Sequence, residues 1–322
     1  MKRFVCGLLA LVMVLSLAAC GKSPAPDTTP DDTPAPDDAP EYFVVGDGVY
    51  RNEKELDEKS IDRAIGKFQT FAEDYCGESQ RVFLALIPSK NGYLNAENGH
   101  LNEAEFAILQ SVYDKWGRNF IDLSVCLTLE DYYRTDPHWR QECLGIVLGE
   151  LGAALEFDTD TTDWAYTPLT ENWTSEVLTE NYIGVYGAEV ENPVPETMTV
   201  LHHPDMEGYI VRNGETGEEM PLYDTEKLSD RDPYELFVGG PLSLVTIENP
   251  AAENDRHLVV VRDSFGSALL PLLAQSYAKV TAVDIRYMMP AMVGNFVDFT
   301  DADVLFLYST TMLNSAISAG LG

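Results

Sequence analysis

The residues best suited to chemistry lie near position 264, where the chain changes from aliphatic to small polar residues. Residues 258–261 are all aliphatic, which predicts a strand buried on both faces. A short turn containing Ser264 and Gly266 follows, and an apolar helical pattern begins directly after it. A strand, a sharp turn and a helix would lift the Ser264 hydroxyl out of the sheet and point free helix N–H groups at a ligand. Ser264 is therefore the candidate nucleophile.

A serine hydroxyl is a weak nucleophile near neutral pH, so it needs a base that a third group orients. The chain has five histidines. His257 directly precedes the predicted strand and lies too far back to reach the turn at its end. His138 follows Asp136 by two residues, and Pro137 favours an extended backbone at Asp136. Such an Asp-x-His pair can present both side chains to a third residue, which makes His138 the candidate base.

Two motifs carry a resemblance to a known family. Residues 136–139, Asp-Pro-His-Trp, resemble the signature of the bacterial DHHW family, with proline in place of the first histidine. Residues 263–265, Asp-Ser-Phe, and 284–287, Asp-Ile-Arg-Tyr, resemble that family's second half. More broadly, the chain from about residue 42 to its end is similar to SGNH-hydrolase-like proteins typified by alginate O-acetyltransferases.

The resemblance implies a Ser-His-Asp triad with Ser264 as nucleophile, His138 as base and Asp136 as the group that orients the base. The histidine lost at Pro137 has no part in that triad. The resemblance also places Arg286 and Tyr287 near the active centre, and it implies a membrane-bound O-acyltransferase partner that delivers acetyl groups.

The order of predicted elements indicates the fold class. Strand patterns at 82–87, 120–123, 258–261, 280–285 and 304–308 alternate with helical patterns at 53–75, 103–116 and 140–155. This alternation predicts an α/β fold, and with the resemblance a three-layer SGNH-hydrolase-like (flavodoxin-like) fold with a parallel sheet. Because strand ends meet at one rim, the candidates for substrate or oxyanion contacts are Arg286, Tyr287, Tyr308 and Asn314. Lys90, which follows another strand, is expected at the surface.

Residues 157–249 interrupt this alternation within the predicted catalytic domain at 42–322. They are rich in Thr, Glu, Pro and Gly with short strand patterns, which predicts an antiparallel β-rich insertion. His202 and His203 lie there, but neighbouring side chains on a strand point to opposite faces, so no metal site is expected. The sequence calls for no cofactor.

The N-terminus predicts export. Residues 1–20 combine Lys2 and Arg3 with an apolar run too short to span a membrane, which is typical of a signal peptide. The Leu-Ala-Ala-Cys ending resembles a bacterial lipobox, with Cys20 as the lipidated residue. Residues 21–41 are rich in Pro, Asp and Thr and are expected to form a disordered tether. We therefore expect an extracytoplasmic protein anchored at the bacterial cell surface by a lipid.

Charge and cysteines narrow the classes of partner. The formal net charge of the whole chain is −32, and residues 42–322 contain 18 basic and 47 acidic residues. Such a surface repels nucleic acid, which excludes it as a partner. Three cysteines, Cys76, Cys126 and Cys143, lie in the predicted domain at spacings that match no zinc site. One disulfide with one free thiol and three reduced thiols are both compatible with the sequence.

Three functions remain open on these grounds. The first is an O-acetyltransferase that acts on a cell-surface or extracellular polysaccharide. The second is a carbohydrate acetyl esterase that uses the same triad. The third is a non-catalytic glycan-binding or structural lipoprotein, in which Ser264, His138 and Asp136 would not meet.

Overall fold

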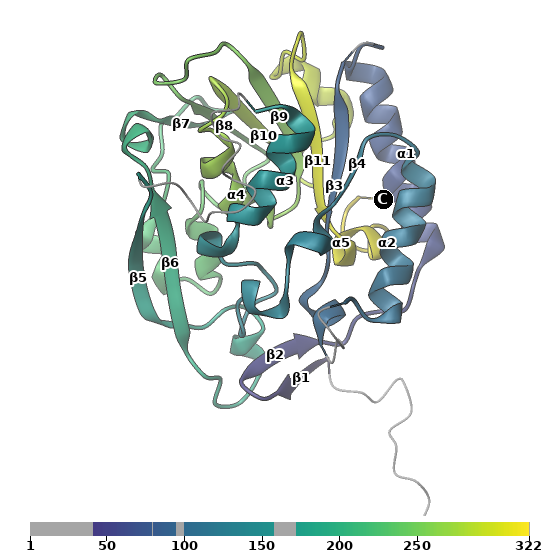
Figure 1. Cartoon of the computed structure of the whole chain (residues 1–322), viewed down its shortest axis with the longest axis vertical. Coiled ribbons are helices and arrows are strands. Elements are labelled where there is room, and N and C mark those ends of the chain that lie inside the picture. Colours follow the sequence, from purple (N-terminus) through teal and green to yellow (C-terminus); the bar gives the residue numbers. More distant parts are fainter. Residues whose placement is uncertain (1–40, 79, 95–99, 158–171, 322) are drawn as a thin grey trace, which may run out of the picture. The chain divides into compact units, whose positions relative to one another are not determined.

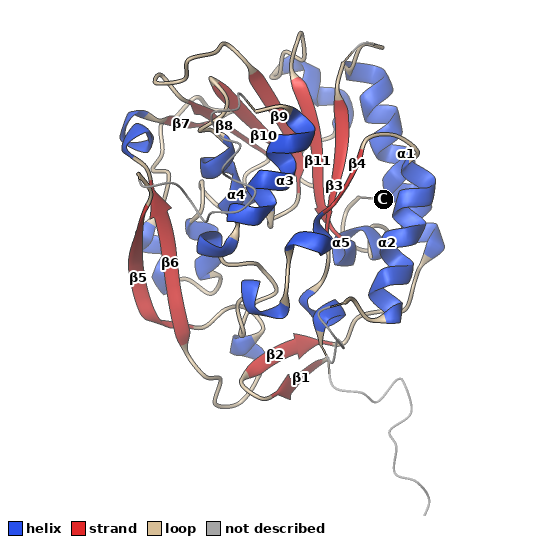
Figure 2. Ribbon diagram, viewed as in Figure 1, coloured by secondary structure: helices blue, strands red, loops and turns tan. Residues whose placement is uncertain are grey.

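A seven-stranded sheet forms the centre of the computed structural model, which describes residues 41–78, 80–94, 100–157 and 172–321 (Figures 1 and 2). Five neighbouring strands are parallel, and two antiparallel strands extend one edge. The order is β4 (Phe120–Asp122), β3 (Val82–Ile87), β11 (Asp303–Ser309), β9 (His257–Arg262), β10 (Lys279–Val283), β8 (Leu244–Glu248) and β7 (Ile210–Asn213). The predicted α/β class with a mostly parallel sheet is confirmed.

Helices cover both faces of this sheet and create two apolar cores (Figure 1). On β3, Leu84 and Leu86 face the core shared with α1 (Glu58–Tyr75), α2 (Glu103–Trp116) and α5 (Thr310–Asn314). Ala85 and Ile87 face the opposite core, shared with α3 (Gly145–Leu155) and α4 (Gly266–Leu273). Successive side chains of a strand point to opposite faces, so a strand between two helical layers must be aliphatic throughout. This accounts for the uninterrupted aliphatic run on β9.

Two helices begin later than the sequence pattern predicts. Helix α1 begins at Glu58 rather than residue 53, because the Asp57 side chain accepts hydrogen bonds from the N–H groups of Lys59 and Ser60. Helix α3 begins at Gly145 rather than residue 140, after a short 3-10 turn at Gln141–Cys143. In both cases the spacing of the apolar residues does not mark where the backbone becomes helical.

The stretch at 157–249 contributes two kinds of structure, and the residues described in it are 157 and 172–249. Strands β5 (Thr174–Tyr182) and β6 (Glu196–His202) form a separate antiparallel pair, in accord with the predicted antiparallel insertion. Strands β7 and β8 from the same stretch join the edge of the central sheet instead. A second hairpin, β1 (Tyr42–Val45) and β2 (Gly48–Arg51), precedes α1.

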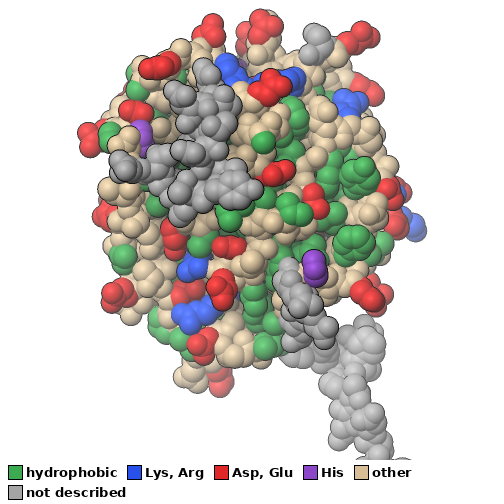
Figure 3. Space-filling model, in the orientation of Figure 1, with side chains coloured by type: hydrophobic (Ala, Val, Ile, Leu, Met, Phe, Trp, Pro, Cys, Tyr) green, Lys and Arg blue, Asp and Glu red, His purple; other side chains and the backbone are tan. Residues whose placement is uncertain are grey.

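Acidic side chains are spread over the face shown in Figure 3, with Lys and Arg at fewer positions. In the part of the chain that is described, no helix is long and apolar enough to cross a membrane. The predicted signal peptide, the predicted lipidation site at Cys20 and the predicted tether up to residue 40 lie outside the described residues.

Candidate active site

Ser264 lies in the turn between β9 and α4, and the neighbouring Asp263 holds that turn in place. One Asp263 carboxylate oxygen accepts the Phe265 N–H at 3.1 Å. The other accepts the N–H and the hydroxyl of Ser309, at the end of β11, at 2.8 Å each. Asp263 is buried, and these bonds join the serine turn to the adjacent strand. The candidate nucleophile is therefore fixed at the carboxyl edge of the sheet.

Gly266 allows α4 to begin so soon after Ser264. A Cβ atom at position 266 would lie 3.0 to 3.2 Å from the side-chain stem of Arg262, the last residue of β9. Any larger residue would require the Arg262 side chain to shift by a few tenths of an ångström.

The structure brings Ser264, His138 and Asp136 into one continuous series of hydrogen bonds. The His138 Nε2 atom lies 2.8 Å from the Ser264 Oγ atom, although 126 positions separate the two residues. On the other side of the ring, His138 Nδ1 lies 2.6 Å from Asp136 Oδ1. This is the arrangement in which an imidazole removes a serine proton while a carboxylate holds its other nitrogen protonated.

The Asp136 carboxylate is fully buried and accepts hydrogen bonds from nearby N–H groups. Its Oδ1 also accepts the His138 backbone N–H at 3.0 Å, and its Oδ2 accepts the Val185 N–H at 3.0 Å. Burial alone would raise the pKa of Asp136, but the His138 charge and these hydrogen bonds outweigh it and lower the pKa below its usual value. Asp136 is therefore ionised near neutral pH. The stability that this carboxylate contributes is lost as the pH falls through its lowered pKa.

Aromatic side chains set the plane of the His138 ring. Tyr234 stacks on the imidazole with ring centres 3.9 Å apart and an interplanar angle of 4°. Phe265 contacts the ring at 4.7 Å, and the Trp139 indole donates to the Phe265 carbonyl at 2.9 Å. Trp139 thereby joins the histidine segment to the serine turn. Sequence reasoning did not identify Tyr234, because nothing near it in the sequence distinguishes it from other tyrosines.

A small residue is required where the chain passes Asp136. A Cβ atom at Gly184 would lie 2.3 Å from the Asp136 Oδ2 atom. The Gly184 N–H donates to the Thr135 hydroxyl, and that hydroxyl donates to Glu196 on β6. The β5–β6 segment thus supports the Asp136 segment directly.

Replacing Gly184 with alanine is expected to displace the Asp136 carboxylate and to lower kcat for ester hydrolysis by at least about tenfold. The free energy of unfolding should fall by about 1–3 kcal/mol because overpacking strains the site. Steady-state kinetics and urea unfolding measure the two effects. Gly46→Ala is a poor control because its φ is positive, whereas Gly66→Ala, with open space around its Cβ, is a suitable one. Unchanged kcat in Gly184→Ala would contradict this contact.

Lys90 is buried, which corrects the expectation that it lies at the surface; only 2% of it is exposed. Its ammonium group donates to the carbonyls of Tyr133, Arg134 and Asp136 at 3.1, 3.0 and 2.9 Å. Burial lowers the pKa of Lys90 to about 8, against the opposing effect of nearby carboxylates such as Asp136. One side chain thus gathers three carbonyls of the segment that carries the candidate base.

Replacing Lys90 with methionine leaves the Tyr133 and Asp136 carbonyls without this donor, whereas the Arg134 carbonyl keeps the Val49 N–H at 2.8 Å. Each unsatisfied buried group costs about 1–3 kcal/mol, and relief of the buried charge offsets part of the sum. We expect the free energy of unfolding at pH 7 to fall by about 2–4 kcal/mol, measured by urea denaturation. Lys59→Met, at an exposed position of α1, is the control and should change stability by less than about 0.5 kcal/mol. A Lys90→Met variant as stable as the parent would contradict this role.

Two cavities meet at Ser264 and His138. The first has a volume of about 160 Å³ and is called the Arg262 cavity; its other walls include Arg262, Tyr234, Ser267, Arg286 and Tyr287. The second has a volume of about 200 Å³ and is called the Met312 cavity; its other walls include Lys90, Pro137, Tyr186, Phe265 and Met312. The candidate nucleophile is therefore open on two sides.

The remaining predicted site residues divide into two groups. Arg286 and Tyr287 line the Arg262 cavity, and the Arg286 guanidinium is bound to Asp284 through its Nε and Nη2 atoms. Tyr308 and Asn314 are not brought to Ser264. Tyr308 is fully buried against Phe68 of α1, and Asn314 binds the Lys54 and Glu55 carbonyls before α1.

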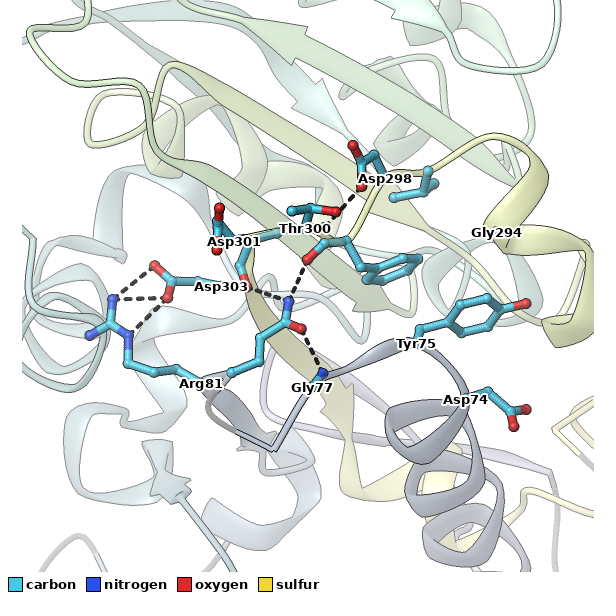
Figure 4. Close-up of a pocket in the computed structure, with 13 residues that line it drawn as sticks. Asp74, Tyr75, Gly77, Arg81, Gly294, Asp298, Thr300, Asp301 and Asp303 are labelled. Atoms are coloured by element: carbon cyan, nitrogen blue, oxygen red, sulfur yellow. Dashed lines mark hydrogen bonds and ion pairs between the residues drawn. The ribbon is translucent and has the colours of Figure 1, made fainter.

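A larger cavity of about 690 Å³, drawn in Figure 4, has none of Ser264, His138 and Asp136 in its wall. Arg81 and Asp303 in its wall stand at the start of β3 and β11, whereas Ser264 follows the end of β9. It therefore occupies the opposite edge of the parallel strands. Among the residues that the structure describes, no group of three or more His, Cys, Asp or Glu side chains is placed to hold a metal ion.

The three described cysteines are free thiols. Burial raises the pKa of Cys76 to about 11 and the pKa values of Cys126 and Cys143 to about 12. A protonated thiol is a poor nucleophile, so none of the three competes with Ser264.

Solved structures of similar length share this architecture. A crystal structure of a DHHW family protein from Eubacterium siraeum matches with a TM-score of 0.66 and 20% identity, over 88% of this chain and 98% of that one. The chain has the DHHW family fold. Bacillus cereus PatB1, solved with a sulfonyl adduct, matches with a TM-score of 0.61 and 17% identity, over 84% of this chain and 97% of that one.

The O-acetyltransferase domain of Pseudomonas putida AlgJ matches at a TM-score of 0.48 and 11% identity, over 86% of this chain and 93% of that one. This match is too distant to bear on activity. No family model and no curated protein matches the sequence. Within the DHHW fold, Pro137 stands between Asp136 and His138 and lines the Met312 cavity. A shared fold does not establish an activity, so the chemistry rests on the site itself.

Proposed function

We propose that this protein is a serine-dependent acyltransferase that O-acetylates a cell-surface or extracellular polysaccharide through Ser264, His138 and Asp136. The observation that carries the proposal is the unbroken series of hydrogen bonds from Ser264 Oγ through His138 to the buried Asp136 carboxylate. A non-catalytic protein would have no use for this geometry at the mouth of two cavities.

In the proposed mechanism, His138 Nε2 takes the proton of Ser264 Oγ as this oxygen attacks an acetyl ester or thioester carbonyl. The Ser264 N–H stabilises the negative charge that develops on the carbonyl oxygen. Asp136 holds the Nδ1 proton and stabilises the imidazolium. His138 then returns its proton to the leaving group. A sugar hydroxyl next gives its proton to His138 and attacks the acyl-serine carbonyl, and His138 passes that proton to Ser264 Oγ as the bond between the acyl group and the serine breaks.

The two cavities favour transfer over hydrolysis. Both the Arg262 cavity and the Met312 cavity reach Ser264 and His138, which gives an acyl donor and an acceptor separate places beside one nucleophile. An esterase, the second candidate, needs room for one substrate and a water molecule. We assign the polysaccharide acceptor to one of these cavities.

The proposed setting is the bacterial cell surface. The N-terminal sequence supports a lipid anchor on Cys20 and a tether over residues 21–41, and the resemblance supports a membrane-bound O-acyltransferase as acetyl supplier. A tether of this composition would hold the catalytic domain, residues 42–322, away from the membrane surface.

A sulfonyl fluoride tests the proposed nucleophile, since PatB1 has been solved with a sulfonyl adduct. We expect phenylmethylsulfonyl fluoride to modify Ser264 alone, as read by peptide mass spectrometry. His138→Ala should slow that labelling by at least about a hundredfold, because the base no longer activates the hydroxyl. The companion assay follows acetate release from 4-nitrophenyl acetate, with and without oligosaccharides. Acyl transfer to sugar marks a transferase and acetate release an esterase. A folded protein that is unlabelled at Ser264 and inactive would overturn both the transferase and the esterase interpretations.

A further inference from the structure

Arg262 is the feature of the Arg262 cavity that the proposed acyl transfer leaves unused. It is the last residue of β9, two positions before Ser264, and only 1% of it is exposed to solvent. Its side chain lines the cavity together with Ser264 and His138. A guanidinium always carries a charge and has five N–H donors, so a buried arginine normally has hydrogen-bond acceptors for most of them.

Those partners are few and weak. Nη1 donates to the Asp263 carbonyl at 3.3 Å and Nη2 to the Gly240 carbonyl at 3.5 Å, the long end of the range for a hydrogen bond. The buried Nε atom has no hydrogen-bond partner. Among the described residues, no carboxylate lies within 4.0 Å of the guanidinium nitrogens. Arg262 thus has unused donors in a fixed, fork-shaped arrangement.

The two acids that act on Arg262 from nearby are already occupied. Asp284 binds Arg286 with both of its oxygens. Asp263 binds Phe265 and Ser309 with both of its oxygens. Burying a charge without a partner is costly, and proteins retain such a group where a ligand completes it.

The cavity has room for one such ligand group. Its volume of about 160 Å³ is below the ~300 Å³ that accommodates a drug-sized molecule, so it suits a single sugar unit or a smaller acid. Asp232 and Glu235 also line the cavity. Their carboxylates repel an anion placed against them and accept bonds from hydroxyl groups, which orients a bound acid with its carboxylate towards Arg262.

We propose that the Arg262 cavity binds a carboxylate, which Arg262 receives with its free N–H groups beside Ser264. A planar guanidinium matches the two oxygens of a carboxylate. The carboxylate belongs either to an acidic sugar of the acceptor or to the acid released when the acyl group is hydrolysed. The assignment of this carboxylate to a substrate or product rests on the proposed acyl transfer. The binding of a carboxylate in the Arg262 cavity does not depend on it.

The test measures Tm of the full chain with sodium glucuronate, sodium acetate or glucose, at an ionic strength held constant with sodium chloride. We expect a Tm rise of about 3 °C at a carboxylate concentration about ten times its Kd, and no rise with glucose. A rise with glucuronate alone identifies an acidic sugar, and an equal rise with acetate identifies the acyl group. The same titration in Ser264→Ala separates a failure of binding from a failure of catalysis.

Two variants assign the effect to Arg262. Arg262→Met, which keeps the apolar stem, should lose the carboxylate-dependent rise, whereas Arg212→Met on the edge strand β7 should keep it. Arg262→Lys keeps the charge but not the planar pair of N–H donors, so the Kd for the carboxylate should rise about tenfold. If Arg262→Met does not fold, this variant provides the test. Absence of any carboxylate effect in the parent, its persistence in Arg262→Met, or an unchanged Kd in Arg262→Lys would overturn the proposal.

Discussion

Replacing Ser264 with alanine is expected to reduce ester hydrolysis by at least about a thousandfold in kcat. The hydroxyl is the only group of the relay that bonds to the substrate carbon, so its removal ends covalent catalysis. Residual activity should reflect substrate binding and oxyanion contacts alone. Initial rates of acetate release from 4-nitrophenyl acetate measure the effect, and circular dichroism shows that the fold is kept.

Ser267→Ala is the matched control for this variant. Ser267 lines the same Arg262 cavity from the first turn of α4, but His138 is hydrogen-bonded to Ser264 instead. Its loss should change kcat by less than about tenfold. The double variant Ser264→Ala/His138→Ala should be no slower than Ser264→Ala, because the two residues act as a unit. Substantial hydrolysis by a folded Ser264→Ala variant would exclude Ser264 as the nucleophile.

The central sheet was predictable because its strands have to be aliphatic on both faces. Residues 258–261 show this directly, since Leu258 and Val260 face one core while Val259 and Val261 face the other. A run of this kind has few alternatives in a chain with helical patterns on either side. Helix starts were less predictable: whether α1 begins at residue 53 or 58 depends on the Asp57 cap, which periodicity does not report.

The candidate relay was predictable because each member has a local signal. Ser264 sits between a strand and a helix, and Asp136 and His138 are two positions apart. The supports of the relay lack such signals. Gly184 meets Asp136 and Tyr234 stacks on His138 only because the chain folds back from the 157–249 stretch, far along the sequence. Contacts between distant segments leave no trace in a single sequence.

The same limit explains the misplaced side chains. The sequence indicated that Tyr308 ends a strand, but β11 continues to Ser309, and Tyr308 lies on the same face as Phe306, towards α1. Lys90 follows the strand end as expected. The Lys90 side chain turns inward because the carbonyls of residues 133, 134 and 136 converge on its ammonium group. The general tendency of lysines to lie at the surface could not predict this contact.

Replacing Asp136 with asparagine is expected to lower kcat by about 10³ to 10⁴-fold while the fold is kept. Asp136 Oδ1 accepts both the backbone N–H and the Nδ1 proton of His138, and Oδ2 accepts the Val185 N–H. Asparagine has one oxygen to offer. With that oxygen towards Val185, its amide donates to Nδ1 and moves the imidazole proton to Nε2, where it can no longer accept the Ser264 proton.

With the oxygen turned towards His138, the amide N–H groups instead face the Val185 N–H, and two donors meet in a buried site. The first orientation sets the amide against the His138 backbone N–H in the same way, so either one costs about 1–3 kcal/mol, and the first also holds the imidazole in its inactive tautomer. Steady-state kinetics should therefore show a loss in kcat with KM changed by less than about threefold, since Asp136 is buried behind His138 and does not line either cavity. Asp47→Asn, at an exposed ion pair with Arg134, is the control. A kcat within tenfold of the parent would mean that Asp136 holds the histidine segment in place without setting its tautomer.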